Sequence, residues 1–421
     1  MLSYGSPDDP GVEFIIATSS RSISSFVGNP VDGCINASNL PFVELIGSTP
    51  SLALHDAATY AGLPSLIIQI TTLADGGVAI GLKFAHPIAD AHSMLQFTSD
   101  WAAVSRALRK REPLPMLSPV FDPSLIDRAA AGDIDALSPL PSILEIARDL
   151  PLHRYDCWNS KIDCPPFLES LTTVPPEVES IVSHFGQPIE WKNWDYKAPV
   201  SYYLVEFSPG ELYAMWEEAN LTSRVSHLDA LLAHIWNLII RARRLDGEYH
   251  LDVSFGFRNR LNPPLPTSFL GSPISSLQVT STAQDAVDHN LGSTAACIRS
   301  ALSAFDASTI PALLHELAFE VSPLRTWGAF FGSRNTIITS WLGKQPRCMR
   351  DMDFGTGPPT VVEAVMPGID GCVQVMEANP RDLEEKSWYE SGAIISLYLR
   401  DDVMENILRD PALRKYRHDK S

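Results

Sequence analysis

A glycine-flanked apolar run at residues 76–85 constrains this chain more than any other segment. Small and branched residues alternate along it, which predicts a buried β-strand that delivers His86 to its end. Pro87 then forces the chain to turn. Apolar residues recur at helical spacing over 89–104, and Asp90 lies near the expected helix start, where a carboxylate is a favoured cap. The segment therefore predicts a strand, a histidine, a short turn, an aspartate and a helix.

The spacing of His86 and Asp90 suggests acyl transfer by a general base. A neutral imidazole, with an ordinary pKa of ~6.5, can take a proton from an alcohol or an amine while that group attacks a carbonyl. Asp90 could orient the imidazole, or it could pair with an arginine elsewhere and hold the turn in shape, and the motif leaves both roles open. An HxxxD match is also expected about once by chance in a chain of this length, so its context has to give it weight.

The HxxxD segment is the first of four that form a wider pattern. In chain order they are residues 64–102, 224–236, 257–266 followed by 271–274, and 339–341 together with 351–359, which contains Asp353-Phe354-Gly355-Thr356-Gly357. Their order and content are similar to those of the BAHD family of acyl-CoA-dependent acyltransferases, in its fungal branch, which includes enzymes that acetylate trichothecene toxins. The resemblance covers most of the chain.

The resemblance implies both a fold and an activity. The fold would be α/β, with two lobes like those of chloramphenicol acetyltransferase, mixed sheets and a site between the lobes. The activity would be transfer of an acyl group, in the first place acetyl, from coenzyme A to a hydroxyl or amine of a small secondary metabolite, through a tetrahedral intermediate. Acyl-CoA would be a co-substrate with no permanently bound cofactor, and the protein would be a cytoplasmic monomer.

The resemblance also assigns roles to the residues of the first and third segments. His86 would be the general base that deprotonates the acceptor. Asp90 matches the family's structural aspartate, which pairs with an arginine, and Arg258 and Arg260 are the two expected partners. A desolvated pair at such a turn would be costly to break, on the order of 3–5 kcal/mol.

The fourth segment would complete the site. Ser340 and Trp341 match the position whose hydroxyl or indole hydrogen can stabilise an oxyanion, although serine before a buried tryptophan is also ordinary strand sequence. Asp353 and Gly355 would shape a loop near the coenzyme without taking part in a chemical step.

Three departures from the family pattern accompany the matches. Ala91 stands where glycine usually follows the aspartate, and Thr356 stands where the DFGWG signature has tryptophan. Neither change removes a catalytic group. Residues 1–16 resemble a segment that normally follows an opening strand, helix and strand, so these elements are expected to be missing and one edge of the first lobe to be uncovered.

The charge balance restricts the partners. The formal net charge of -18 argues against nucleic acid and against an anionic membrane. An anionic acyl donor then needs a local basic patch, and Arg241, Arg243 and Arg244 at the end of an apolar helical pattern are candidates to bind the phosphates of coenzyme A. The alternative is a charged helix end whose cations offset the macrodipole.

Cysteine and apolar patterns exclude further classes. The six cysteines show no CxxC spacing, which favours reduced thiols in a cytoplasmic protein over a disulfide scaffold or a zinc site. No apolar run reaches the ~18–20 residues that a membrane span needs. No metal cofactor is expected.

At 421 residues the chain is too long for one ordinary core and predicts two lobes. Residues 1–195 would form the N-terminal lobe, which ends in a proline-rich crossover, and 196–421 the C-terminal lobe with the DFGxG motif. The expected strands are 12–18, 65–73, 77–85, 200–207, 250–257, 274–280, 335–341, 361–366, 371–377 and 393–400. The expected helices are 89–104, 209–219, 226–244, 284–304, 311–320 and 402–409.

Other functions stay open from the residues. His86, Asp90 and His92 could hold a metal ion in a hydrolase, although their spacing does not place all three on one helix face. A condensation domain of nonribosomal peptide synthesis shares the fold and HxxxD, but it usually has a second histidine where this chain has Ala85. The motif departures also allow a catalytically impaired relative that acts as a binding protein.

Overall fold

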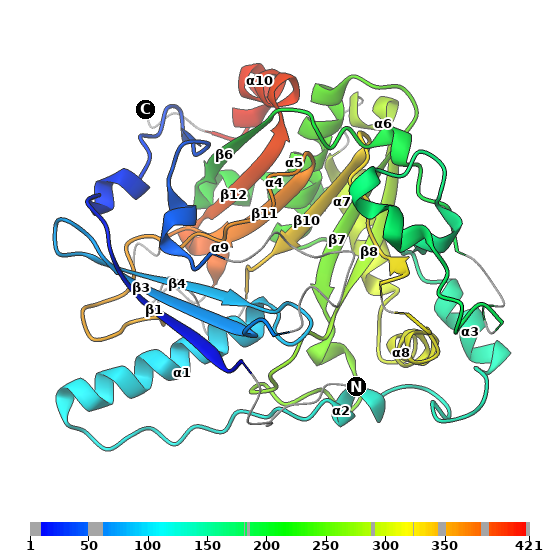
Figure 1. The fold of residues 1–421 in the computed structure, drawn as a ribbon. Helices are drawn as coiled ribbons and strands as arrows, with labels where there is room; N and C mark the ends of the chain where they lie inside the picture. The colour runs from blue at the N-terminus through cyan, green and yellow to red at the C-terminus, as the bar shows by residue number, and fades with distance from the viewer. Residues whose placement is uncertain are drawn as a thin grey trace.

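The computed structural model describes residues 10–48, 62–180, 182, 186–287, 291–322, 324–343, 351–379 and 387–417. In this part of the chain a three-stranded sheet has the order β1-β3-β4 and a seven-stranded sheet the order β2-β6-β12-β11-β10-β7-β8, while β5 pairs with β9. Figure 1 shows α1 running alongside the small sheet, and α4, α5 and α7 on the far side of the large sheet.

The strands and helices have the following bounds, given in chain order. The strands are β1 (Val12–Thr18), β2 (Cys34–Asn36), β3 (Leu66–Thr72), β4 (Val78–Phe84), β5 (Tyr155–Asp156), β6 (Val200–Phe207), β7 (Glu248–Gly256), β8 (Ile274–Thr282), β9 (Thr326–Trp327), β10 (Asn335–Ser340), β11 (Cys372–Glu377) and β12 (Ala393–Arg400). The helices are α1 (Ala91–Lys110), α2 (Ser124–Asp127), α3 (Pro141–Arg148), α4 (Pro209–Asn220), α5 (His227–Arg243), α6 (Ala283–Val287), α7 (Leu291–Ser303), α8 (Ile310–Ala318), α9 (Trp388–Ser391) and α10 (Asp401–Arg409).

Most of the predicted strands and helices are confirmed, but one prediction is wrong. The expected helix 284–304 contains α6 and α7, and residues 288–290 between them lie outside the described part of the chain. The expected strand 361–366 is not a strand, because its middle residue, Glu363, accepts hydrogen bonds from side chains of β6 and β12 and the segment lies over the sheet without pairing.

The two faces of the large sheet differ in polarity. Val253, Ile338, Val373 and Leu397 are neighbours in register across β7, β10, β11 and β12, and they belong to the main hydrophobic core with the residues of α5. Side chains alternate along each strand, so the next residue of each strand faces the other way. That inner face carries polar side chains, and it is the face on which the segment around Glu363 lies.

The small sheet is packed on α1, with the ring centroids of Phe84 and Phe97 5.5 Å apart. Its outer strand β1 leaves Val12, Phe14 and Ile16 exposed at 55%, 55% and 72%. These apolar residues lie on one face of an edge strand, because alternate residues point the same way.

Candidate active site

His86 lies two residues after the end of β4, and its side chain is exposed. Its Nδ1 atom is 3.4 Å from the Oγ atom of Ser272, a residue just before β8. A hydrogen bond from Nδ1–H to this hydroxyl would leave Nε2 as the basic nitrogen. The strand therefore presents an accessible imidazole beside a hydroxyl from the other sheet.

Asp90 is buried behind this histidine and begins α1. Its Oδ1 atom accepts a hydrogen bond from the backbone N–H of Ser93 at 3.0 Å, so it is the helix cap that the sequence predicted. Both carboxylate oxygens also accept from Arg258, whose Nη2 lies 2.9 Å from Oδ1. The structure thus selects Arg258 over Arg260 as the partner of Asp90.

Arg260 has a different environment. Its Nη1 atom donates to the carbonyl oxygens of Leu302 and Phe305, at 3.1 and 2.7 Å, at the end of α7. A cation satisfies unpaired carbonyls at a helix C-terminus. Arg260 therefore holds α7, while Arg258 holds the turn after His86.

A second set of bonds fastens the start of α1 to the large sheet. The Oγ atom of Ser93 donates to the carbonyl oxygen of Gly271 at 2.7 Å and accepts from its N–H at 2.9 Å. Arg258 donates to the same Oγ at 2.9 Å. Ser93 and Ser272 were not predicted from the sequence, although Ser93 stands three residues after the cap, at a position whose N–H a capping side chain accepts.

Ser340 and Trp341 lie at the end of β10. Strands β7 and β11 flank β10 and run parallel to it, so the carboxyl ends of the three strands share one edge of the sheet. Trp341 packs in a small apolar cluster with Leu95 of α1 and Met376 of β11. The structure thus brings Ser340 and Trp341 to the edge at which α1 begins.

The loop of Asp353 and Gly355 packs on the same helix. One oxygen of Asp353 accepts the backbone N–H groups of Gly355, Thr356 and Gly357 at 2.7, 3.0 and 2.8 Å, and these bonds, that of Gly355 first, lower the pKa of the carboxyl. The ring of Phe354 meets that of Trp101 edge-on at 5.0 Å. Asp353 therefore organises its own loop.

Gly355 has a positive φ of 103°, which glycine adopts without strain. A Cβ atom there would lie 3.2 Å from the Cδ atom of Arg109, so the loop approaches α1 closely. Arg106 of the same helix donates to the carbonyl oxygen of Asp353.

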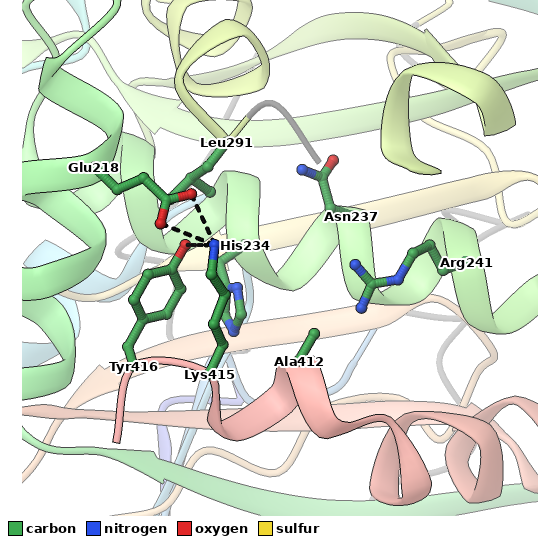
Figure 2. Close-up of a pocket in the computed structure, with 8 residues that line it drawn as sticks. All are labelled: Glu218, His234, Asn237, Arg241, Leu291, Ala412, Lys415 and Tyr416. Carbon is green, nitrogen blue, oxygen red and sulfur yellow. Dashed lines mark hydrogen bonds and ion pairs between the residues drawn. The ribbon is translucent and has the colours of Figure 1, made fainter. Parts of the chain in front are cut away.

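The three arginines at the end of α5 have varied surroundings. Arg241 pairs with Asp410 at 2.5 Å. Together with His234 it also lines a cavity of about 30 Å³ (Figure 2), and this cavity has room for one or two water molecules. Arg243 is buried with its Nη2 3.4 Å from Asp370. Arg244 is exposed. Arg241 and Arg243 thus tie the end of α5 to other segments, while the helix-end interpretation and the coenzyme role both stay predictions.

Two features are absent from the described residues. No group of three or more His, Cys, Asp and Glu side chains in that part of the chain has a geometry that could hold a metal ion. Within the same residues, no helix has the length and apolar character of a membrane span.

The amino-acid sequence is similar to a known protein family and to a fungal acyltransferase. A family model described as the Transferase family matches residues 6–148 and 209–411. Acyltransferase AFT15-1 of Alternaria alternata is 28% identical over 427 residues, which cover 98% of this chain and 79% of the relative.

Two solved structures have a similar fold. TRI101 of F. sporotrichioides, complexed with coenzyme A and T-2, has a TM-score of 0.61 and 17% identity and covers 96% of this chain and 80% of its own. Vinorine synthase has a TM-score of 0.58 and 18% identity, with 93% and 74% covered. These likenesses confirm the predicted fold class.

Proposed function

The chain belongs to the Transferase family, the BAHD acyltransferases, and from this we propose that it moves an acetyl group from acetyl-CoA to a hydroxyl of a small acceptor, with His86 as general base. The observation that carries the proposal is the exposed imidazole of His86 at the end of β4, in front of the buried pair of Asp90 and Arg258. The relative solved with coenzyme A and T-2 supports both the donor and a small acceptor.

The reaction proceeds in two steps. Nε2 of His86 takes the proton of the acceptor hydroxyl as its oxygen attacks the thioester carbonyl, which forms a C–O bond and a tetrahedral oxyanion. Collapse of this intermediate breaks the C–S bond, and the imidazolium returns its proton to the leaving coenzyme A thiolate. Atoms and charge balance without a further reactant.

Neighbouring side chains assist these steps. In this proposal Ser272, whose Oγ lies 3.4 Å from Nδ1 of His86, has the role of accepting the Nδ1–H, which leaves Nε2 free to act. Ser340 and Trp341 supply the donor for the oxyanion, and loss of one such donor lowers the rate by about 10²-fold or more. Asp90 acts through Arg258, since this pair holds the turn that carries the histidine.

The test is turnover of acetyl-CoA with a panel of hydroxylated and amino metabolites, followed by release of free thiol and by mass spectrometry of the product. His86→Ala should lower kcat by about 10²–10⁴-fold with an unchanged thermal midpoint. Equal rates for His86→Ala and the parent would refute the mechanism.

His92→Ala is the matched control. His92 lies on the first turn of α1, and its Nε2 is 2.9 Å from the carbonyl oxygen of Thr267. The general-base mechanism predicts that this variant keeps its activity, whereas a metal site built from His86, Asp90 and His92 would lose it. If neither the parent nor His92→Ala forms product although both bind acetyl-CoA, the result would favour a binding protein without catalytic activity.

A further inference from the structure

The inner face of the large sheet carries a row of polar side chains. Ser254 of β7, Thr339 of β10, Gln374 of β11 and Ser396 of β12 are neighbours in register, so their side chains point to the same side. Gln374 and Ser396 are fully buried, whereas Ser254 and Thr339 are partly exposed. The row therefore runs from a closed end at β12 to an accessible end at β7.

Gln374 is the unusual member of this row. Neither its amide nitrogen nor its amide oxygen has a hydrogen-bond partner among the residues that the structure describes, and the residue has 0% exposure. A buried amide without partners is costly and calls for an explanation such as a bound molecule. Ser396 is its neighbour in register, but the hydroxyl of Ser396 donates to Glu363 at 3.1 Å and makes no hydrogen bond with the amide.

The position of Gln374 links the row to the proposed site. Met376, two residues further along the same strand, points to the same face and packs with Trp341 and with Leu95 of α1. Two strand residues span about 7 Å. Gln374 thus lies one side-chain row below the contact between α1 and the sheet, and Thr339 directly precedes Ser340.

We propose that the amide of Gln374, with the hydroxyls of Thr339 and Ser254, binds a polar oxygen group of the acceptor remote from the hydroxyl that is acylated. This inference rests on the proposed function. An amide offers both a donor and an acceptor and carries no charge, so it fits a carbonyl or hydroxyl group. The acceptor class is therefore a neutral molecule with several oxygen functions.

A neighbouring acidic group disfavours carboxylate acceptors. Glu363 lies over the closed end of the row, where its Oε1 accepts from Tyr202 at 2.7 Å as well as from Ser396. An acceptor carboxylate near Gln374 would be a further acidic group in the buried surroundings of Glu363, where a low dielectric disfavours a charge. Neutral oxygen groups avoid that cost.

The decisive variant is Gln374→Met, which keeps the length of the side chain and removes both polar atoms. It should raise the acceptor KM about tenfold, the value of one ordinary hydrogen bond, while the KM for acetyl-CoA stays unchanged. Its thermal midpoint should stay the same or rise, because an amide without protein partners is lost.

Gln69→Met is the matched control. Gln69 is also buried, but its amide nitrogen donates to the carbonyl oxygen of Glu44 at 2.8 Å and to Thr71 Oγ1 at 3.0 Å. This variant should lower the thermal midpoint and leave the acceptor KM unchanged. The opposite responses of two buried glutamines separate a binding role from a structural one.

Calorimetric titration of neutral polyoxygenated panel members into His86→Ala, with and without Gln374→Met, tests binding without turnover. Weaker binding in the double variant supports the inference, even if the parent protein shows no acyl transfer and the proposed function fails. Three results would overturn the inference: equal binding by the two proteins, no binding of any such compound, or a thermal midpoint of Gln374→Met that falls as in Gln69→Met. Turnover by the parent protein would uphold the proposed function in each of these cases.

Discussion

Replacement of Asp90 by asparagine tests how the fold holds its histidine. The side chains of Asp90 and Arg258 are only 5% and 9% exposed. Asparagine caps a helix about as well as aspartate, so the change removes the charge and leaves the cap. Loss of one partner from a buried ion pair costs about 3–5 kcal/mol. Arg258 keeps its bonds to Ser93 and Gly271, so we expect a loss near the lower end, about 3 kcal/mol.

Urea denaturation measures this loss, and a second buried pair provides the control. Asp156 and Arg325 are 2% and 9% exposed, with an N···O distance of 2.7 Å, and they lie away from α1 where β5 meets β9. Asp156→Asn should lower the free energy of unfolding by a similar amount. Only Asp90→Asn should also lower kcat per folded molecule, because only that pair holds the turn after His86.

Two results would refute this reasoning. A loss of stability below about 1 kcal/mol in Asp90→Asn would mean that the pair behaves like an exposed one. An unchanged kcat per folded molecule would mean that the turn keeps its shape without the pair, so that Asp90 does not position His86.

Two further predictions concern Glu363 and the loop at residues 353–357. Burial raises the pKa of Glu363 from 4.5 to about 7, so its contribution to stability is complete below pH 4.5 and is lost as the pH rises through about 7. This contribution of Glu363 to the free energy of unfolding should therefore fall by at most about 3 kcal/mol between pH 4.5 and about pH 8. Glu363→Gln should flatten this dependence in urea denaturation, and an unaltered slope would contradict the assignment. Gly355→Ala should lower the thermal midpoint more than Gly357→Ala, because both have φ near 100° but only Gly355 faces Arg109; equal midpoints would mean that the loop yields at that contact.

The sequence predicted the elements well where one signal dominated. The strand before His86 and the cap at Asp90 follow from local patterns, and both are confirmed. The choice between Arg258 and Arg260 could not be made, because two residues in one short turn have similar chemistry and only the surrounding fold decides which way each points.

Other features depended on contacts between distant segments. Residues 361–366 are rich in apolar and β-branched residues like a buried strand, but in the structure they lie over the sheet with Glu363 bonded to β6 and β12. Gln374 stands in a strand whose side chains alternate between the two faces of the sheet. Its residue type alone does not tell whether the face that carries it is exposed to solvent, buried or part of a binding site. Such properties arise when segments far apart in the sequence pack together, and local patterns do not contain them.

The short strand β2 has a consequence for how the molecule can be divided. It comes from the first 40 residues, yet it pairs with β6 and forms one margin of the seven-stranded sheet. A cut at the predicted boundary between residues 195 and 196 would strip that margin and leave the hydrogen-bonding groups of β6 open to other chains. The halves should therefore aggregate when expressed apart and recover activity only when produced together, as fragments that complement each other.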